Sequence, residues 1–341
     1  MALIDKLTAI ADGFRDSRGT TEPLTLDEMA VLAAEPISSG GGEEEWFNDG
    51  DTHIWIELPE GRTSPILGVC PSGTVTVDWG DGTEPDVLTG EYTSLVLWTP
   101  THNYAKAGSY VITLKTDGKI GFNQYNEYSC LLRQTVENNT SNNVYQNAIV
   151  KIEIGNRVSY LGYNAFCRLY SLKSVFMHEC LVTSIPSELF YQCYSLKTVV
   201  IPNGIKSISH RIFSQCYSLE NVVIPSGAPV LGTAMFNQCY ALKSVVIPDS
   251  VNTLNNNCFS QCGFTYVTMP SSLTTIYTGA FEYCYGVKCY DFSNCTQIPT
   301  ISSPSVFTIS SDCEIRVPSA LYDEWITTDN WSTLASQIVA V

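Results

Sequence analysis

The chain has 341 residues, an apolar fraction of 44%, 13 cysteines and a formal net charge of -16. This length predicts two or three domains, and the apolar content is sufficient for globular cores. Because the charge excess is acidic and no basic stripe occurs, nucleic acid and anionic membrane surfaces are poor partners. The sequence has no membrane-spanning apolar run, so we expect no membrane insertion.

The first forty-five residues predict a small helical module. Thr25 and Glu28 form a capping box ahead of a short apolar helix. Before it, alternating four- and three-residue spacing places apolar side chains on one helix face. These assembly residues are Leu3, Leu7, Ile10 and Phe14. Helices this short bury too little to fold alone, so we expect residues 1–45 to be an anchor and acidic linker that docks on other copies, as in a homotrimer, or on another protein.

Residues 46–118 alternate apolar and polar side chains, which predicts strands. Asp81-Gly82 marks a tight hairpin, and a second phrase runs from His102 to Leu114. The Trp-Gly-Asp-Gly strand, followed by His-x-Tyr and Gly-x-Tyr, resembles the β-sandwich of the polycystic-kidney-disease (PKD) type. That resemblance covers this segment alone. It implies an immunoglobulin-like spacer domain, which is common in surface proteins and rarely catalytic.

A phrase that returns about every twenty-three residues dominates the rest of the chain. Its best copies, at 190–202, 213–225 and 236–248, read Phe-x-Gln-Cys-Tyr-x-Leu-x-x-Val-Val-Ile-Pro. A weaker copy starts at Phe166, and degenerate copies start at Phe259 and Phe281. Such a period predicts a solenoid, in which each repeat buries its apolar face against its neighbours. We expect the solenoid over residues 119–312, with an atypical first coil near Ile152, and a C-terminal cap over 313–341.

The repeat phrase, with a following Ile-x-x-Ile as at Ile205 to Ile208, resembles the BspA-type bacterial leucine-rich repeat. It departs from that family by carrying Tyr after the Cys, where small hydroxyl residues are usual. The segment from Ile315 to Trp325, with Trp331 beyond it, resembles the closing cap of the same family. The expected fold class is therefore mainly β with short helices: a helical segment, an immunoglobulin-like sandwich, then a leucine-rich-repeat solenoid with a C-terminal cap.

One position of the repeat is occupied by cysteine in five copies: Cys193, Cys216, Cys239, Cys262 and Cys284. We expect a column of buried, inert thiols. Stacked coils lie about 4.8 Å apart, which by distance alone also permits disulfides. Because the side chains of one column point the same way, free thiols are the favoured interpretation.

Two outward columns are candidate binding surfaces. Because side chains alternate along a strand, the residue between Val and Ile points outward. This first column is Phe176, Val200, Val223, Val246, Thr268 and Asp291. Its apolar members predict an interaction surface, or simply suit a strand.

The second outward column follows the cysteines and is broken at Gly263. Its members are Tyr170, Tyr194, Tyr217, Tyr240 and Tyr285. Tyrosine offers an apolar face and a hydroxyl tip, which sugar rings and protein hot spots both use. A parallel row of amides, which can add hydrogen bonds, contains Gln192, Gln215, Gln238 and Gln261. The alternative is a stack that only stiffens the turn.

Catalysis finds little support in the sequence. The four histidines lie in unrelated segments, and no zinc-binding spacing recurs. The segment Asp78 to Gly82 mimics the start of an EF-hand but lacks its spacing and terminal Glu. We therefore predict no catalytic residues, no metal and no cofactor. A cell-wall-degrading enzyme would need paired carboxylates at a cleft, whereas the acidic residues here are scattered.

The opening residues and the Leu24-Thr-Leu-Asp-Glu-Met29 segment resemble the N-terminus of tail-associated proteins from phages and prophages of gut Firmicutes. That resemblance implies a virion protein whose solenoid binds a glycan or protein on the host cell surface. Residues 1–12 contain Asp5 and no continuous apolar run, which argues against a secretory signal and favours the virion. The alternative is a bacterial adhesin, surface-bound or secreted, that binds host protein or glycan.

Overall fold

The computed structural model describes residues 46–47, 49–90, 99–122, 131–133, 144–202 and 204–341. Backbone contacts divide the chain into Met1–Phe47 and Asn48–Val341. The predicted assembly residues Leu3, Leu7, Ile10 and Phe14 lie outside the described part. The described part is mainly β with few helices, and none of its helices has the length and apolar character needed to cross a bilayer.

Antiparallel strands form the N-terminal part of this second unit. The strands are β1 (Thr52–Leu58), β2 (Ile66–Leu67), β3 (Cys70–Asp78), β4 (Asp86–Gly90), β5 (Gly108–Thr116), β6 (Lys119–Phe122) and β7 (Leu132–Arg133). Strands β4, β3, β5 and β1 lie side by side in that order, and β2 pairs with β7. Alternate residues such as Ile54, Ile56 and Ile112 are buried, as the period-two pattern predicts.

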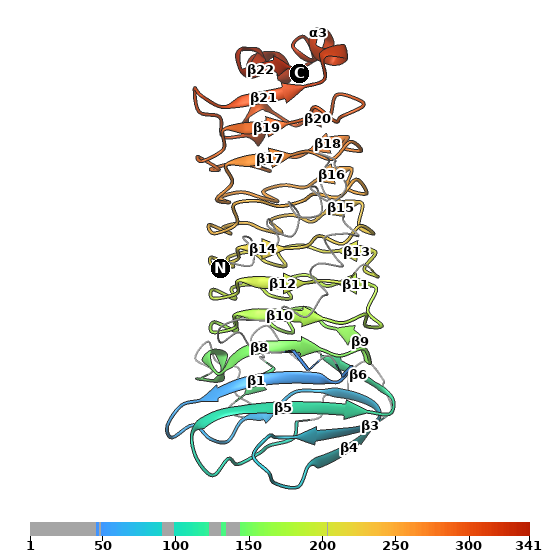
Figure 1. Cartoon of the computed structure of the whole chain (residues 1–341), viewed down its shortest axis with the longest axis vertical. Coiled ribbons are helices and arrows are strands. Elements are labelled where there is room, and N and C mark those ends of the chain that lie inside the picture. The colour runs from blue at the N-terminus through green and yellow to red at the C-terminus, as the bar shows by residue number, and fades with distance from the viewer. Residues whose placement is uncertain (1–45, 48, 91–98, 123–130, 134–143, 203) are drawn as a thin grey trace, which may run out of the picture. The chain divides into compact units, whose positions relative to one another are not determined.

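The solenoid has two walls of short parallel strands, and the first strand of each wall pairs with a strand of this N-terminal part. Strand β1 pairs antiparallel with β8 (Ile149–Ile154), and β8 then pairs parallel with β10 (Ser174–Met177). On the other wall, β6 pairs parallel with β9 (Val158–Leu161). Hydrogen bonds therefore cross the boundary predicted at residue 118, and the N-terminal strands cover the exposed edge of the first coil. Figure 1 shows β1 directly beside β8.

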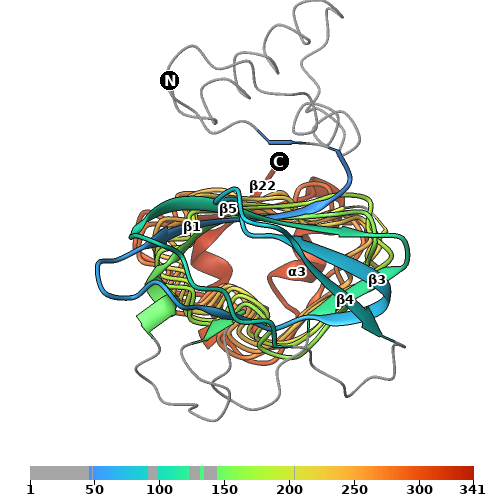
Figure 2. The same ribbon diagram turned by 90° about the horizontal axis from the view of Figure 1, so that it is seen from below.

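Most coils contribute one short strand to each of two facing walls, but the coil that follows Phe236 has no strand on the first wall. The first wall holds β12 (Thr198–Val200), β14 (Asn221–Val222), β17 (Tyr266–Thr268) and β19 (Cys289–Asp291). The second holds β11 (Ser184–Ile185), β13 (Ser207–Ile208), β15 (Val230–Leu231), β16 (Thr253–Leu254), β18 (Thr275–Ile276) and β20 (Thr300–Ile301). The strands of one wall pair in parallel and in register with the repeat, so Val175 lies beside Val199, and Val199 lies beside Val222. Viewed along the stack in Figure 2, successive coils superimpose as a flattened ring.

A column of phenylalanine rings forms the spine of the core. Consecutive ring centroids lie 5.2–5.9 Å apart, and every ring is at most 5% exposed. The rings belong to Phe166, Phe190, Phe213, Phe236, Phe259, Phe281 and Phe307. Leu196, Leu219 and Leu242 form a second buried column. The repeat phrase thus identifies the inward positions correctly, because only apolar side chains can be stacked away from water at every coil.

The last coil ends in short helical segments. Strand β21 (Glu314–Val317) leads into η3 (Ser319–Leu321), α3 (Tyr322–Trp325) and η4 (Trp331–Gln337), and β22 (Ile338–Ala340) pairs back onto β21. The remaining short helices are η1 (Val144–Asn147) and η2 (Pro304–Val306). Trp325 and Trp331 are fully buried with ring centroids 5.3 Å apart, and the Trp331 Nε1–H donates to the Pro299 carbonyl. Their rings close the apolar end of the stack.

Candidate functional site

The cysteine column explains how the coils are joined near the tyrosines. Each thiol donates to the carbonyl of the phenylalanine one coil earlier: Cys216 to Phe190, Cys239 to Phe213 and Cys262 to Phe236, with Sγ···O distances of 3.2 Å. These cysteines are buried, and their thiols are free. Burial raises the pKa of the Cys284 thiol to about 11. The thiols are therefore protonated donors at neutral pH and serve packing.

A left-handed turn precedes each of these cysteines. Gln192, Gln215, Gln238 and Gln261 have φ between 60° and 64°. This conformation directs their N–H groups to the next coil, where the Gln215 N–H, for example, donates to the Asn237 carbonyl at 2.7 Å. The turn ends with the cysteine pointing inward and the following tyrosine pointing outward.

The tyrosines after the cysteines stack face to face. The ring centroids of Tyr170 and Tyr194, and of Tyr194 and Tyr217, lie 4.9 Å apart, and those of Tyr217 and Tyr240 lie 5.3 Å apart. The interplanar angles are 8°, 2° and 19° respectively. We call these four rings the tyrosine stack. Within it the inner faces cover one another, so a ligand meets ring edges and hydroxyl groups.

The neighbouring glutamines hydrogen-bond along the same edge. Gln192 Oε1 accepts from Arg168 Nε at 2.9 Å, and Gln192 Nε2 donates to Gln215 Oε1 at 2.8 Å. The Tyr240 hydroxyl donates to Gln261 Oε1 at 3.3 Å. Some of the glutamine amide groups that we expected to bind a ligand therefore form hydrogen bonds between coils, which hold the side chains in register.

The stack is interrupted where one turn is a residue shorter. Leu242 follows Cys239 by three positions, whereas the buried Phe264 follows Cys262 by two. Gly263 occupies the shortened turn, and a Cβ there would stand 2.2 Å from the Tyr240 carbonyl oxygen. The missing ring leaves a hollow of about 490 Å³, named here the Gly263 hollow. Its lining residues are Tyr240, Gln261, Cys262, Gly263, Tyr283, Tyr285 and Gly286.

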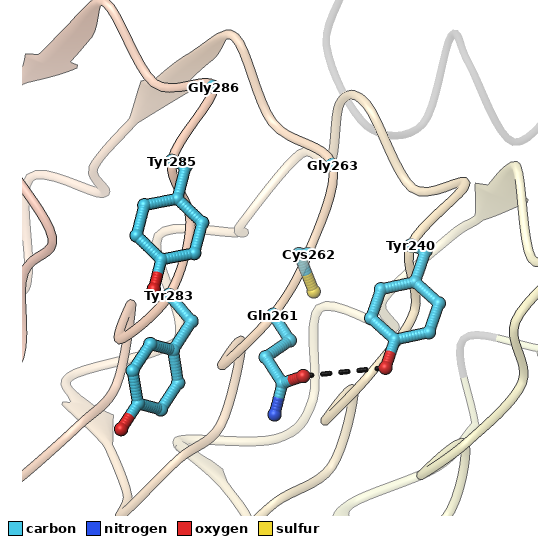
Figure 3. A pocket seen from close by; sticks show the side chains of 7 residues that line it. All are labelled: Tyr240, Gln261, Cys262, Gly263, Tyr283, Tyr285 and Gly286. Atoms are coloured by element: carbon cyan, nitrogen blue, oxygen red, sulfur yellow. Dashed lines mark hydrogen bonds between the residues drawn. The ribbon is translucent and has the colours of Figure 1, made fainter.

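Three tyrosine rings border the Gly263 hollow. Figure 3 shows Tyr240 on one side of Gln261 and Gly263, with Tyr283 and Tyr285 on the other. The side chains of Tyr240, Tyr283 and Tyr285 are 51%, 48% and 72% exposed. The sequence pattern predicted Tyr240 and Tyr285 but missed Tyr283. The sequence does mark Tyr283 as unusual, because this repeat position holds Gln in four other copies.

The chain's family follows from its repeats. Residues 118–183 and 171–288 match the family described as BspA type Leucine rich repeat region, in six copies, and together span just over half of the 341 residues. The chain belongs to this BspA-type leucine-rich repeat family. The family resemblance of the repeat phrase is thereby confirmed, as is the solenoid. The PKD-type and phage-tail resemblances remain predictions.

Several solved structures are similar to this family member. A leucine rich cell surface protein from Faecalibacterium prausnitzii is 20% identical, with a TM-score of 0.42 over 60% of this chain and 68% of that one. A leucine rich repeat protein from T. pallidum is 24% identical, with a TM-score of 0.40 over 55% and 78% of the two chains. The pneumococcal vaccine antigen PcpA is 17% identical, with a TM-score of 0.40 over 56% of each. No curated protein matches this sequence.

The apolar column on the wall of this BspA-type solenoid is less regular than the tyrosine stack. Phe176 and Val200 lie within strands β10 and β12 and are half-buried, whereas Val246 is 45% exposed and lies outside any strand. Val223 directly follows β14. These side chains form a row on one wall, and the Gly263 hollow includes none of them.

Asp78, Asp81 and His102, which precede the solenoid, stabilise the local fold. The His102 ring stacks on Trp79 with centroids 4.9 Å apart, and its Nε2 lies 2.8 Å from Asp81 Oδ2. Burial acts to raise the pKa of Asp81, but hydrogen bonds from Thr83 and His102 outweigh it and lower the value to about 2. The Asp78 carboxylate accepts from the Gly80 N–H. Within the described residues, no three His, Cys, Asp or Glu side chains gather as metal ligands.

Proposed function

We propose that this protein is a non-enzymatic recognition protein that binds a glycan or protein of a cell surface through the tyrosine edge of its solenoid. The observation that carries the proposal is the ordered tyrosine stack, whose ring centroids lie 4.9–5.3 Å apart and in which Tyr217 and Tyr240 are exposed. Side chains that are already ordered lose little entropy on binding. A repeating edge also suits a polymer that can contact several coils at once.

Two cellular locations are compatible with this role. Membership of the BspA-type repeat family supports an adhesin on a bacterial surface or secreted from the cell, and we propose this location first. The N-terminal resemblance favours a phage tail instead, with residues 1–45 as the anchor. Mass spectrometry of surface-shaved cells and of purified virions from the same culture separates the two. Peptides of this protein in virions alone would overturn the adhesin assignment.

The binding role is tested by removing part of the stack. Substitution of Tyr170, Tyr194 and Tyr217 by Ser leaves the Gly263 hollow intact. Each ring contact is worth about 1 kcal/mol, so the triple variant should lose most binding to bacterial or host cells, by about a hundredfold or more. Flow cytometry with the fluorescently labelled full chain measures this loss.

A matched control uses tyrosines that are more exposed than those substituted and lie outside the stack. Tyr163, Tyr266 and Tyr277 are 50%, 42% and 43% exposed, and their substitution by Ser should leave cell binding unchanged. Both triple variants must first show the thermal melt of the native chain. Equal cell binding by the two variants would exclude the tyrosine stack as the binding surface and favour the column of Val200, Val223 and Val246.

A further inference from the structure

The Gly263 hollow is where the tyrosine stack offers an uncovered ring face. One face of Tyr240 stacks on Tyr217, at a centroid distance of 5.3 Å. Toward the next coil the stack has no ring, because Gly263 takes the place of a tyrosine. The face of an aromatic ring carries the negative part of its quadrupole and attracts C–H groups and other ring edges. A ring-shaped ligand can therefore occupy the missing place in the stack.

Several departures from the repeat meet at this hollow. The shortened turn brings Gly263 against Tyr240, and Gly286 replaces the Ser or Ala that follows the tyrosine in regular copies. Tyr283 replaces the usual Gln although its φ is 61°, a conformation that is unfavourable for a bulky side chain. The core columns of Phe and Cys continue unchanged through the same coils. Close backbone approach accounts for Gly263 and Gly286, because a Cβ on Gly286 would stand 2.9 Å from the Phe264 carbonyl oxygen. Packing does not require the exposed Tyr283, and a ligand is a reason for it.

The chemistry of the lining fits a neutral, hydroxyl-rich ring. No charged side chain belongs to the seven lining residues. Tyrosine hydroxyls and the Gln261 amide supply both donors and acceptors. The negative charge of the nearby Glu282 carboxylate raises the pKa of the Tyr283 hydroxyl and disfavours an anionic ligand. A partner's aromatic side chain prefers a pocket closed to water, whereas the three tyrosines here stay about half exposed or more.

We propose that the Gly263 hollow binds one ring of a neutral saccharide chain, with the sugar C–H face against Tyr240 and hydroxyl groups on Gln261 and Tyr283. The volume of about 490 Å³ lies in the range of small-ligand pockets, which is roughly 300–1,000 Å³. The hollow adjoins the end of the tyrosine stack, so the remaining sugar rings of the saccharide can lie along the tyrosine stack. This assignment rests on the proposed function and names its ligand class.

The test uses the full chain on an array of neutral oligosaccharides built from hexoses and N-acetylhexosamines, followed by titration calorimetry with the best-bound oligosaccharide. Saturable binding is expected, and the double variant Tyr283→Gln with Tyr285→Ser should weaken it at least tenfold. Tyr283→Gln restores the residue of the regular copies, so the fold is kept. The control Tyr277→Ser changes an exposed tyrosine outside the hollow and should bind as the native chain does.

A second variant fills the hollow. Replacing Gly263 by a Tyr-Ser pair restores the regular turn and supplies the missing ring, so saccharide binding should disappear while the thermal melt is kept. Absence of saturable binding to any oligosaccharide, or native affinity in the double variant or the filled variant, would overturn the proposal. Displacement of the bound sugar by a tryptophan-containing peptide, with tighter binding of that peptide, would also overturn it in favour of a protein ligand.

The two proposals fail in different ways. The Tyr170, Tyr194 and Tyr217 variant keeps the hollow, and the Tyr283 and Tyr285 variant keeps the stack. If the first variant loses cell binding and the second has native affinity for every oligosaccharide, the recognition role stands and the hollow assignment falls. If neither variant changes cell binding but the hollow variant loses saccharide affinity, the saccharide site stands and the tyrosine stack is not the cell-binding surface.

Discussion

The regular coils between Phe190 and Ile247 and the interrupted coil around Gly263 share the phenylalanine and cysteine columns of the interior but have different surfaces. In both, phenylalanine rings stack at about the same spacing and the cysteine thiol donates to the preceding coil. Outside, one has stacked tyrosines and the other a hollow. The contrast teaches that the apolar columns limit change in the interior, whereas an outer turn can lose a residue. Departures from the repeat that spare the core are therefore where a specific function is to be sought.

The largest effect is expected from a charge placed in the shared interior. Leu242 is fully buried, and Leu242→Asp introduces a carboxylate without a partner, which costs several kcal/mol, a large part of the stability of a typical domain. The array should unfold cooperatively at a much lower temperature, as measured by circular dichroism. Lys243→Asp, at the adjacent exposed position, is the matched control and should melt near the native temperature. Similar melts for both would mean that the interior and exterior are assigned wrongly.

A smaller loss of stability is expected when a side chain is added at Gly263 without lengthening the turn. In Gly263→Ala the new Cβ meets the Tyr240 carbonyl oxygen at 2.2 Å, so the backbone must shift. Such overpacking typically costs about 1–3 kcal/mol. Gly204→Ala, where the nearest atom is a Glu179 side-chain oxygen at 3.9 Å, should be close to neutral in the same melting assay. Equal melting temperatures for the two variants would show that the interrupted coil is as loosely packed as an ordinary loop.

The cysteine column predicts a difference between two conservative changes. Cys239→Ala removes the thiol donor of the Phe213 carbonyl, which still accepts the Cys216 N–H, so the lost hydrogen bond should cost about 0.5–1.5 kcal/mol, whereas Cys239→Ser keeps a donor in place and should lose less. Chemical denaturation at neutral pH measures both. An alanine variant more stable than the serine variant would show that apolar packing alone decides this column in regular coils.

The N-terminal strands should respond to acid through Asp81. The pKa of Asp81 is lowered to about 2, so its contribution to stability is present above an unfolded-state pKa of about 3.9 and is lost as the pH falls through about 2. The melting temperature of Asp81→Asn should lie below that of the native chain at pH 5, with the gap narrowing toward pH 2. Asp323→Asn, at an exposed position of α3, is the control. A constant gap from pH 5 to pH 2 would contradict the assigned Asp81 pairing.

Sequence patterns predicted the inner columns well and the binding surface in part. The Phe, Cys and Leu positions follow from their recurrence, because a side chain present in every coil must satisfy the same buried surroundings. The outward direction of Tyr194, Tyr217 and Tyr240 also follows. Tyr283 escaped notice because it breaks a polar row and belongs to no column of its own. The role of the Gln192 amide between coils was missed as well, since hydrogen bonding to Gln215 depends on rotamers that the pattern does not encode.

By itself the sequence determined the period, the family and which side chains face inward, because hydrophobic burial depends on residue type at a repeating position. Only the tertiary structure decided what happens between coils. It showed that β1 extends the wall through β8, that the thiols donate to phenylalanine carbonyls, and that Tyr240 has a hollow beside one face. These features depend on distances between residues some twenty positions or more apart. Such distances are set when coils stack, and a deletion at Gly263 changes them without altering the apolar pattern on either side.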